Sequence, residues 1–299
     1  MKTIYKLLLV VAALSATVFV SCKKDDPYKD DDTYVAKAVE TPEYADAIKV
    51  VDLSKVATPV TTKKGDIVKS IEFTESGYAI ITKESTKADS DVTTTVTTYT
   101  FAAGVYKVAG FGDVKIDGAK ITITAASGND APAEDVEVEA TVTTPSAANS
   151  DFYSSWKIYS TNVVVNGEGV KVDHIFEGSK AASLYEMAKY INEKKQVIEA
   201  DDFKGYVIES VTLTKNGTFL VKFQGADPYV GDFSLSGNKF SYKLDVEGNF
   251  ALNAEANGTI NIDKDSNLCI LDINGSFKYN NDSYTTKVTL KLEQIKNVN

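Results

Sequence analysis

The sequence contains no arginine. All 32 of its basic residues are lysines, against 42 acidic residues, and the net charge is −10. Arginine is the side chain that holds phosphate through two parallel hydrogen bonds, and nucleic-acid-binding surfaces carry a basic field. We therefore expect no nucleic acid among the partners of this protein.

Histidine and cysteine are nearly absent too. His174 is the single histidine, and Cys22 and Cys269 are the two cysteines. Zinc sites combine several such side chains, so we expect no metal and no cofactor. Cys269 stands in the apolar run Asn-Leu-Cys-Ile-Leu-Asp. This run predicts a small buried side chain.

Motifs of catalysis are also missing. The sequence has neither a Gly-x-Ser-x-Gly elbow nor a P-loop. Paired carboxylates could hydrolyse glycosides, but the candidates Glu199, Asp201 and Asp202 stand in a polar link. The sequence predicts a protein that is not an enzyme, with a hydrolase as the third alternative.

A possible calcium loop is incomplete. Asp263, Asp265 and Asn267 have the oxygen spacing that begins such a loop. Leu268 and Asn274 occupy the positions where glycine and a bidentate glutamate are required. A hairpin turn is the better interpretation.

The N-terminus has the order of a secretory signal. Lys2 and Lys6 precede an apolar run, which ends at Val20-Ser21-Cys22. The apolar stretch from Leu7 to Val20 has 14 residues, whereas a bilayer-spanning helix needs about 20. Residues 1–21 are therefore predicted to be a signal peptide.

The segment Phe19-Val20-Ser21-Cys22 resembles a lipobox, with Phe19 where leucine is usual. The resemblance implies cleavage before Cys22, which then carries diacylglycerol and an acyl chain such as palmitate. Several acyl chains on one residue anchor a protein firmly. The membrane is thus an expected partner, through Cys22.

Residues 22–43 are predicted to be a lipidated flexible tether. They include Lys23-Lys24-Asp25-Asp26 and a further run of three aspartates, which cannot bury enough apolar surface to fold. The charged run resembles signals that send Gram-negative lipoproteins to the outer face of the outer membrane. The cell surface is the expected location, and the alternative faces the periplasm.

The rest of the chain is predicted to be mostly β. Residues 44–145 and 151–299 form two expected modules of antiparallel, barrel-like meanders. The spacing of Tyr44, Ala47, Ile48, Val51 and Leu53 suggests a brief helix at the start of the first module. Asn-Gly and Gly-Asn pairs in the second module predict hairpin turns; these stand at 216–217, 237–238, 248–249, 257–258 and 274–275.

One short helix is expected in the second module. Ser183 and Glu186 form a capping box, and four apolar residues then recur at helical spacing; these are Leu184, Met187, Ala188 and Ile191. The two modules also resemble each other, since residues 67–78 can be laid over residues 207–218. We therefore expect two related units.

The segment from Trp156 to Gln294 resembles the lipocalin-like domains of Gram-negative envelope lipoproteins. It has an early tryptophan, a helix and a meander of about eight strands, with Ser154 where lipocalins have glycine. The resemblance implies a barrel, and such barrels can enclose a small apolar ligand.

The expected function is a lipid-anchored, non-catalytic envelope protein that binds a small apolar molecule or serves as a structural surface module. The alternative is a surface glycan-binding protein that works with an outer-membrane transporter. Candidate ligand-binding residues are aromatic: Trp156, Tyr229, Tyr279 and Tyr284.

Overall fold

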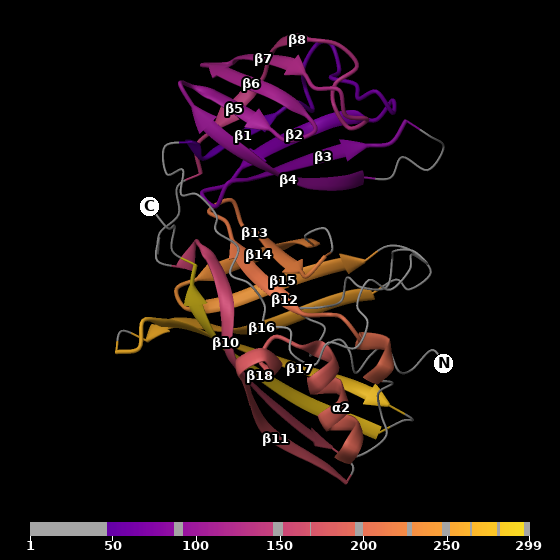
Figure 1. Ribbon diagram of the computed structural model, residues 1–299, viewed down its shortest axis with the longest axis vertical. Helices are drawn as coiled ribbons and strands as arrows, with labels where there is room; N and C mark the ends of the chain where they lie inside the picture. The colour runs from indigo at the N-terminus through magenta and orange to yellow at the C-terminus, as the bar shows by residue number, and fades with distance from the viewer. Residues whose placement is uncertain are drawn as a thin grey trace. The chain divides into compact units, whose positions relative to one another are not determined.

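The computed structural model describes residues 47–86, 92–145, 152–167, 169–194, 200–225, 229–246, 252–263, 265–279 and 282–295. Cys22 and its tether lie outside the described residues, so the lipid anchor stays a prediction. The chain divides into two compact units: most of one is Thr41–Ala148, and most of the other is Asn149–Lys296. We call them the N-terminal and C-terminal barrels (Figure 1).

The N-terminal barrel is built from nine strands. They are β1 (Lys49–Asp52), β2 (Ile67–Phe73), β3 (Tyr78–Glu84), β4 (Val92–Ala102), β5 (Val105–Val108), β6 (Gly112–Asp117), β7 (Lys120–Ala125), β8 (Val136–Glu139) and β9 (Thr141–Thr143). Each of β1 to β7 pairs antiparallel with the next, β8 pairs with β7 and β9 pairs with β1. The strands β8 and β9 are one run interrupted only at Ala140, so this run closes the meander.

The C-terminal barrel follows a similar plan. Its elements are β10 (Ser155–Gly167), β11 (Val170–Glu177), η5 (Gly178–Lys180), α2 (Leu184–Lys194), η6 (Ala200–Phe203), β12 (Ile208–Leu213), β13 (Thr218–Phe223), β14 (Tyr229–Ser236), β15 (Lys239–Val246), β16 (Leu252–Asp263), β17 (Leu268–Tyr279) and β18 (Asp282–Gln294). Pairing runs from β10 to β12 and on to β18, which returns to β10. The expected mostly β, antiparallel and barrel-like fold is confirmed.

The two barrels share topology and detail. Val51 of β1 pairs with both β2 and β9, and Trp156 of β10 pairs with both β12 and β18. The hairpins β2–β3 and β12–β13 each carry a register shift at the same position, which leaves Lys69 and Glu209 as the extra residues. Residues 67–78 and 207–218, which resemble each other in sequence, therefore form hairpins of the same structure in the two barrels.

The turns of these hairpins also match. Gly77 and Gly217 both have positive φ, +78° and +84°, which glycine adopts without steric cost. Their carbonyl oxygens accept hydrogen bonds from the backbone N–H of Tyr99 (2.8 Å) and Phe233 (2.7 Å). Each turn is thereby fixed to the next strand of its barrel.

The C-terminal barrel differs by an insertion. Between β10 and β12 the chain forms β11, η5, α2 and η6, and α2 packs against β11 (Figure 1). The helix begins after Ser183, whose Oγ accepts a hydrogen bond from the N–H of Glu186 (3.3 Å). The Glu186 carboxylate pairs with Lys180 (3.2 Å) instead of returning to the cap. The expected apolar face of the helix is buried.

Buried side chains of the described residues form one core cluster in each barrel. In the C-terminal barrel, Trp156, Phe219, Phe233, Phe240 and Tyr284 join the aliphatic residues of the strands and of α2 in one cluster. A second cluster fills the N-terminal barrel. Such burial supplies the main favourable term in folding. Within the part of the chain that the structure describes, no helix has the length and apolarity needed to cross a membrane.

Two local predictions are wrong. Lys49–Asp52 is strand β1, not part of a helix, because its β-branched residues pair with two neighbouring strands. The pairs Asn257-Gly258 and Asn274-Gly275 lie within β16 and β17, not in turns. A Cβ atom at Gly258 would lie 1.8 Å from the carbonyl oxygen of Asp272. Gly258 thus permits a close approach of two backbones.

Candidate functional site

In the C-terminal barrel, the strands β10 and β12 pair with each other over a short stretch only. In the N-terminal barrel, Asp52 still pairs with β2, and the N–H of Leu53 then donates to the carbonyl of Lys69 (2.8 Å). In the C-terminal barrel, the pairing of β10 with β12 ends at Trp156. The two sheets therefore differ at one equivalent place.

The insertion occupies part of the resulting gap. The N–H of Ile208 donates to the carbonyl of Ala182 (3.0 Å), and Ser183 bridges to Val207. On the other side, Thr161 Oγ1 donates to the carbonyl of Ala181 (2.6 Å). The residues between η5 and α2 are thus held between β10 and β12.

A groove of about 540 Å³ lies where the strands part. Its lining comes from β10, β12, β18, the last residue of β11, and the inserted segment from η5 to the start of α2. The residues are Lys157, Ile158, Tyr159, Glu177, Gly178, Ser179, Ala182, Ile208, Glu209 and Glu293. The volume falls in the range of about 300–1,000 Å³ that small-molecule sites have. We call it the β10–β12 groove and take it as the candidate site.

Two β-bulges point residues into this groove. The register of β10 shifts against β18 between Ile158 and Ser160, so Tyr159 is the extra residue there. The shift in β12 leaves Glu209 as the extra residue. A bulge redirects a side chain and often lies beside a functional site. Tyr159 keeps 55% of its surface exposed, although it is a large aromatic residue in a barrel strand.

The charges of the groove are mainly negative. Lys157 pairs with Glu293 (3.0 Å), and Glu209 pairs with Lys222 (3.2 Å), which is not part of the lining. Glu177 is exposed and has no ion-pair partner among the described residues. Among the described residues, the lining therefore contains three carboxylates and one ammonium group. The half-buried Ile158 and the buried Ile208 and Ala182 are its apolar residues.

None of the four predicted ligand-binding residues is among the described residues that line this groove. Trp156 is buried, and its Nε1–H donates to the carbonyl of Phe152 (3.0 Å). Tyr284 is buried in the same core. Tyr229 and Tyr279 lie at the start of β14 and the end of β17, and their side chains are outside the described part. Their role in binding stays a prediction.

The sequence signal for the groove was weak. Tyr159 follows Trp156, Lys157 and Ile158 in an ordinary strand pattern. Only the interruption of alternation at Ile158-Tyr159-Ser160 could have indicated it. Glu209 could have been found from the repeated hairpin, because the equivalent residue of the N-terminal barrel is Lys69.

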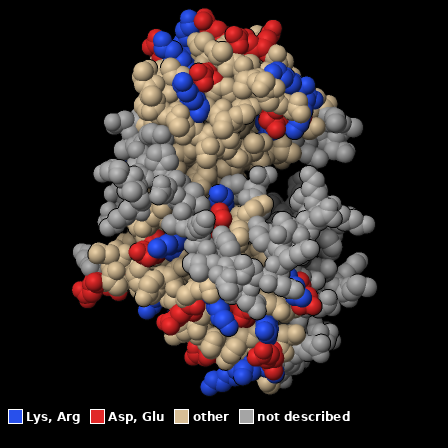
Figure 2. Space-filling view, in the orientation of Figure 1, with Lys and Arg blue, Asp and Glu red and all other residues tan. Residues whose placement is uncertain are grey.

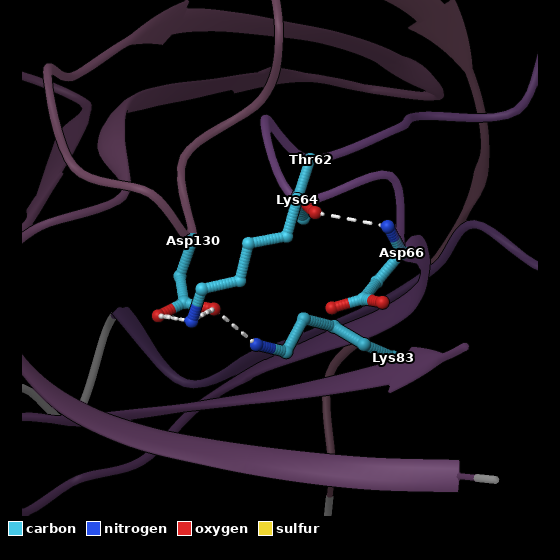
Figure 3. A network of polar contacts seen from close by, with 5 residues as sticks. All are labelled: Thr62, Lys64, Asp66, Lys83 and Asp130. Carbon is cyan, nitrogen blue, oxygen red and sulfur yellow. Dashed lines mark hydrogen bonds and ion pairs between the residues drawn. The ribbon is translucent and has the colours of Figure 1, made fainter. Parts of the chain in front are cut away.

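A second polar cluster lies in the N-terminal barrel (Figure 3). Lys83 Nζ contacts Asp130 Oδ1 (2.7 Å), and Lys64 Nζ contacts the same carboxylate (3.2 Å). The pKa of Asp130 is lowered, chiefly by the hydrogen bond from Lys83 and then by that from Lys64. The cluster joins the β7–β8 connection to β3 and to the β1–β2 connection, so its charges serve the fold.

The remaining reactive side chains are also in structural surroundings. His174 of β11 stacks on Tyr190 of α2, with ring centroids 3.9 Å apart. Cys269 is fully buried, and burial raises the pKa of its thiol to about 12. In the described part of the chain, no three His, Cys, Asp or Glu side chains are grouped so as to hold a metal ion.

Charged side chains of both signs are scattered over the surface. On the face shown in Figure 2, lysines lie beside aspartates and glutamates in both units. Comparison of the chain with protein-family models, with curated proteins and with solved structures gave no match.

Proposed function

We propose that this chain is a lipid-anchored, non-catalytic binding protein of the cell envelope, and that the β10–β12 groove is its ligand site. One observation carries the proposal. The C-terminal barrel opens at the place where the N-terminal barrel, built on the same strand order, stays paired. The opening comes with two features that the N-terminal barrel lacks among its described residues: the inserted segment between β10 and β12, and the bulge at Tyr159.

The composition of the groove supports a small ligand. The half-buried Ile158 lies in the lining together with carboxylates and the exposed ring of Tyr159, and the buried Ile208 and Ala182 also belong to it. Ligand pockets combine apolar surface with a few polar groups that fix orientation. Buried side chains of the described residues pack together in the barrel interior, and we place the ligand in the groove.

A glycan is the second candidate ligand. The exposed ring of Tyr159 favours it, because the flat face of a sugar can stack on an aromatic ring while its hydroxyl groups donate to carboxylates. Glu177 and Glu209 are carboxylates of the same lining that would accept these hydrogen bonds.

The anchor is proposed from the sequence. Cys22 would carry the lipid, with the protein at the outer membrane, on the cell surface or facing the periplasm. Cells that express the Cys22→Ala variant should show no incorporation of labelled palmitate into this chain, and the chain should leave the membrane fraction. Retention of the variant in that fraction would contradict a lipid anchor.

The ligand site is tested by native mass spectrometry of the chain from Lys23 onward, released from its own envelope by mild proteolysis. We expect an extra mass of a few hundred daltons. Ser179→Trp should remove it, because Ser179 is exposed and lines the groove. Thr58→Trp, at an exposed position of the N-terminal barrel, is the matched control. A clean mass for the wild-type chain, or an extra mass kept by Ser179→Trp, contradicts the proposed site.

A further inference from the structure

We infer that the β10–β12 groove takes a small amphipathic cation, an ammonium or guanidinium group on a short apolar body. The inference rests on the proposed function of the groove and adds the chemical class of its ligand. Three features of the lining carry it: its charge, the position of Tyr159 and the apolar residues beside both.

The first feature is the negative charge. Its described residues supply three carboxylates, from Glu177, Glu209 and Glu293, and one ammonium group, from Lys157. Lys157 is paired with Glu293, and Glu209 has Lys222 at 3.2 Å. Glu177 remains without an ion-pair partner among the residues that the structure describes. An anionic ligand would be repelled by this lining, and a cation would gain from it.

The second feature is the ring of Tyr159, which lines the groove together with the carboxylate of Glu177. Glu177 is the last residue of β11 and pairs across the hairpin with Ser160, which directly follows Tyr159 in β10. Both side chains line the same groove. A cation over the face of a tyrosine is attracted by the ring, and a carboxylate can accept its hydrogen bonds. A neutral ligand would use only part of this arrangement.

The third feature is the apolar surface. Ile158 and Ile208 come from the two strands that part, and Ala182 comes from the segment between them. Ile158 is half-buried and can cover part of a short hydrocarbon or aromatic body, which contributes in proportion to the apolar area removed from water, whereas Ile208 and Ala182 are buried. A simple metal ion or ammonium ion would leave that surface uncovered.

The N-terminal barrel gives an internal comparison. Its bulge residue at the position of Glu209 is Lys69, which has the opposite charge and pairs with Glu84 (2.5 Å). The Lys69 carbonyl accepts the hydrogen bond that keeps the strands together there. The barrel that opens is therefore the one with a carboxylate at this bulge.

The test is a calorimetric titration of the chain from Lys23 onward with four probes: benzylammonium, benzyl alcohol, benzoate and maltose. We expect benzylammonium to bind about tenfold more tightly than benzyl alcohol, and benzoate not to bind. Raising the salt concentration should weaken benzylammonium binding, because the charges are partly exposed. Ser179→Trp should abolish binding of both aromatic probes.

Two substitutions separate charge from shape. Glu177→Gln should weaken benzylammonium about fivefold and leave benzyl alcohol unchanged, as for a partly exposed charge. Tyr159→Leu keeps an apolar side chain and should also weaken benzylammonium more than benzyl alcohol. Glu139→Gln, an exposed carboxylate of the N-terminal barrel, is the control and should change neither.

Each contrary outcome has its own meaning. Equal affinity for benzylammonium and benzyl alcohol, both lost in Ser179→Trp, overturns the cation and leaves the groove as a binding site. Maltose binding that Ser179→Trp removes, without benzylammonium binding, replaces the cation by a glycan. If no probe binds, or if Ser179→Trp has no effect, the cation inference is overturned. A neutral or anionic molecule identified in the native complex overturns the cation but not the proposed function.

Discussion

The ring of Tyr284 lies against the backbone of Gly167, its partner across the strand pair that closes the C-terminal barrel. A Cβ atom at Gly167 would lie 2.3 Å from Cδ1 of the ring and 2.7 Å from the carbonyl oxygen of Ser283. Packing of an aromatic ring over a glycine in the neighbouring strand is a known means of fixing register in sheets. Tyr284 thus has a structural task at the seam of the barrel.

Gly167→Ala should destabilise the C-terminal barrel by about 1–3 kcal/mol, because the added methyl group overlaps the ring and backbone carbonyl. In an unstrained position the same substitution would be stabilising. Urea unfolding followed by the fluorescence of Trp156, the single tryptophan, measures the change. Asn166→Ala, at the exposed neighbouring position, is the control and should stay near the wild type. A neutral or stabilising Gly167→Ala would contradict the close contact.

Asp130→Asn should destabilise the N-terminal barrel by about 1–2 kcal/mol. The side chain of Lys83 is only 5% exposed and would lose its anionic partner, while water reaches the 37%-exposed Asp130 and screens part of the effect. Urea unfolding followed by circular dichroism measures the loss, with Asp113→Asn on the exposed face of β6 as the control. An unchanged midpoint for Asp130→Asn would show that the network does not hold the loop.

The ion pair between Lys83 and Asp130 should make the stability of the N-terminal barrel depend on pH. Because the pKa of Asp130 is lowered below its ordinary value of 3.8 in the folded state, its contribution is complete above that value. The contribution disappears as the pH falls through the lowered pKa. Wild type and Asp130→Asn should therefore differ in stability at pH 7 and converge in strong acid. A difference that persists at low pH would have another origin.

The thiol of Cys269 should not react with Ellman's reagent in the native chain from Lys23 onward. The side chain is buried in the C-terminal core, and its pKa of about 12 leaves little thiolate at neutral pH. In urea, reactivity should rise together with the loss of Trp156 fluorescence, because both residues belong to one core cluster. Rapid reaction without denaturant would place Cys269 outside that core.

Alkaline pH should weaken the N-terminal barrel through Tyr106. Burial raises the pKa of Tyr106 from 10.0 to about 12. Stability from the neutral phenol is complete below pH 10 and is lost as the pH rises toward 12. Tyr106→Phe keeps the stacking on Phe73, whose ring centroid is 4.0 Å away. This variant should lose less stability between pH 10 and 12 than the wild type when both are followed by circular dichroism.

Local patterns predicted the elements whose causes are local. The turn at Asn216-Gly217 and the helix after Ser183 follow from residues that are close in the sequence, and both are present. Strand β1 could not be predicted in this way. Its four residues become a strand because β2 and β9 lie on either side of it, and β9 is about 90 residues away in the sequence.

The groove escaped prediction for a related reason. It depends on where β10 leaves β12, and nothing in residues 155–160 alone fixes that point. The sequence identifies aromatic residues by their type, but type does not predict exposure. Trp156 and Tyr284 are buried, whereas Tyr159 is exposed. Comparison of the two halves of the chain is more informative, because the shared hairpin makes the difference between Lys69 and Glu209 visible.

The strand pairs that close the two barrels, β9 with β1 and β18 with β10, have a consequence for the order in which the barrels fold. The N-terminal barrel closes on Thr141–Thr143, so all of its strands have been synthesised before the second unit begins. The C-terminal barrel needs contact between Trp156 and Gln294, at opposite ends of the unit. Pairings so distant in sequence are slow to form. As the chain is synthesised, the first barrel can thus complete itself alone, while β10 must wait, unpaired along that edge, for β18.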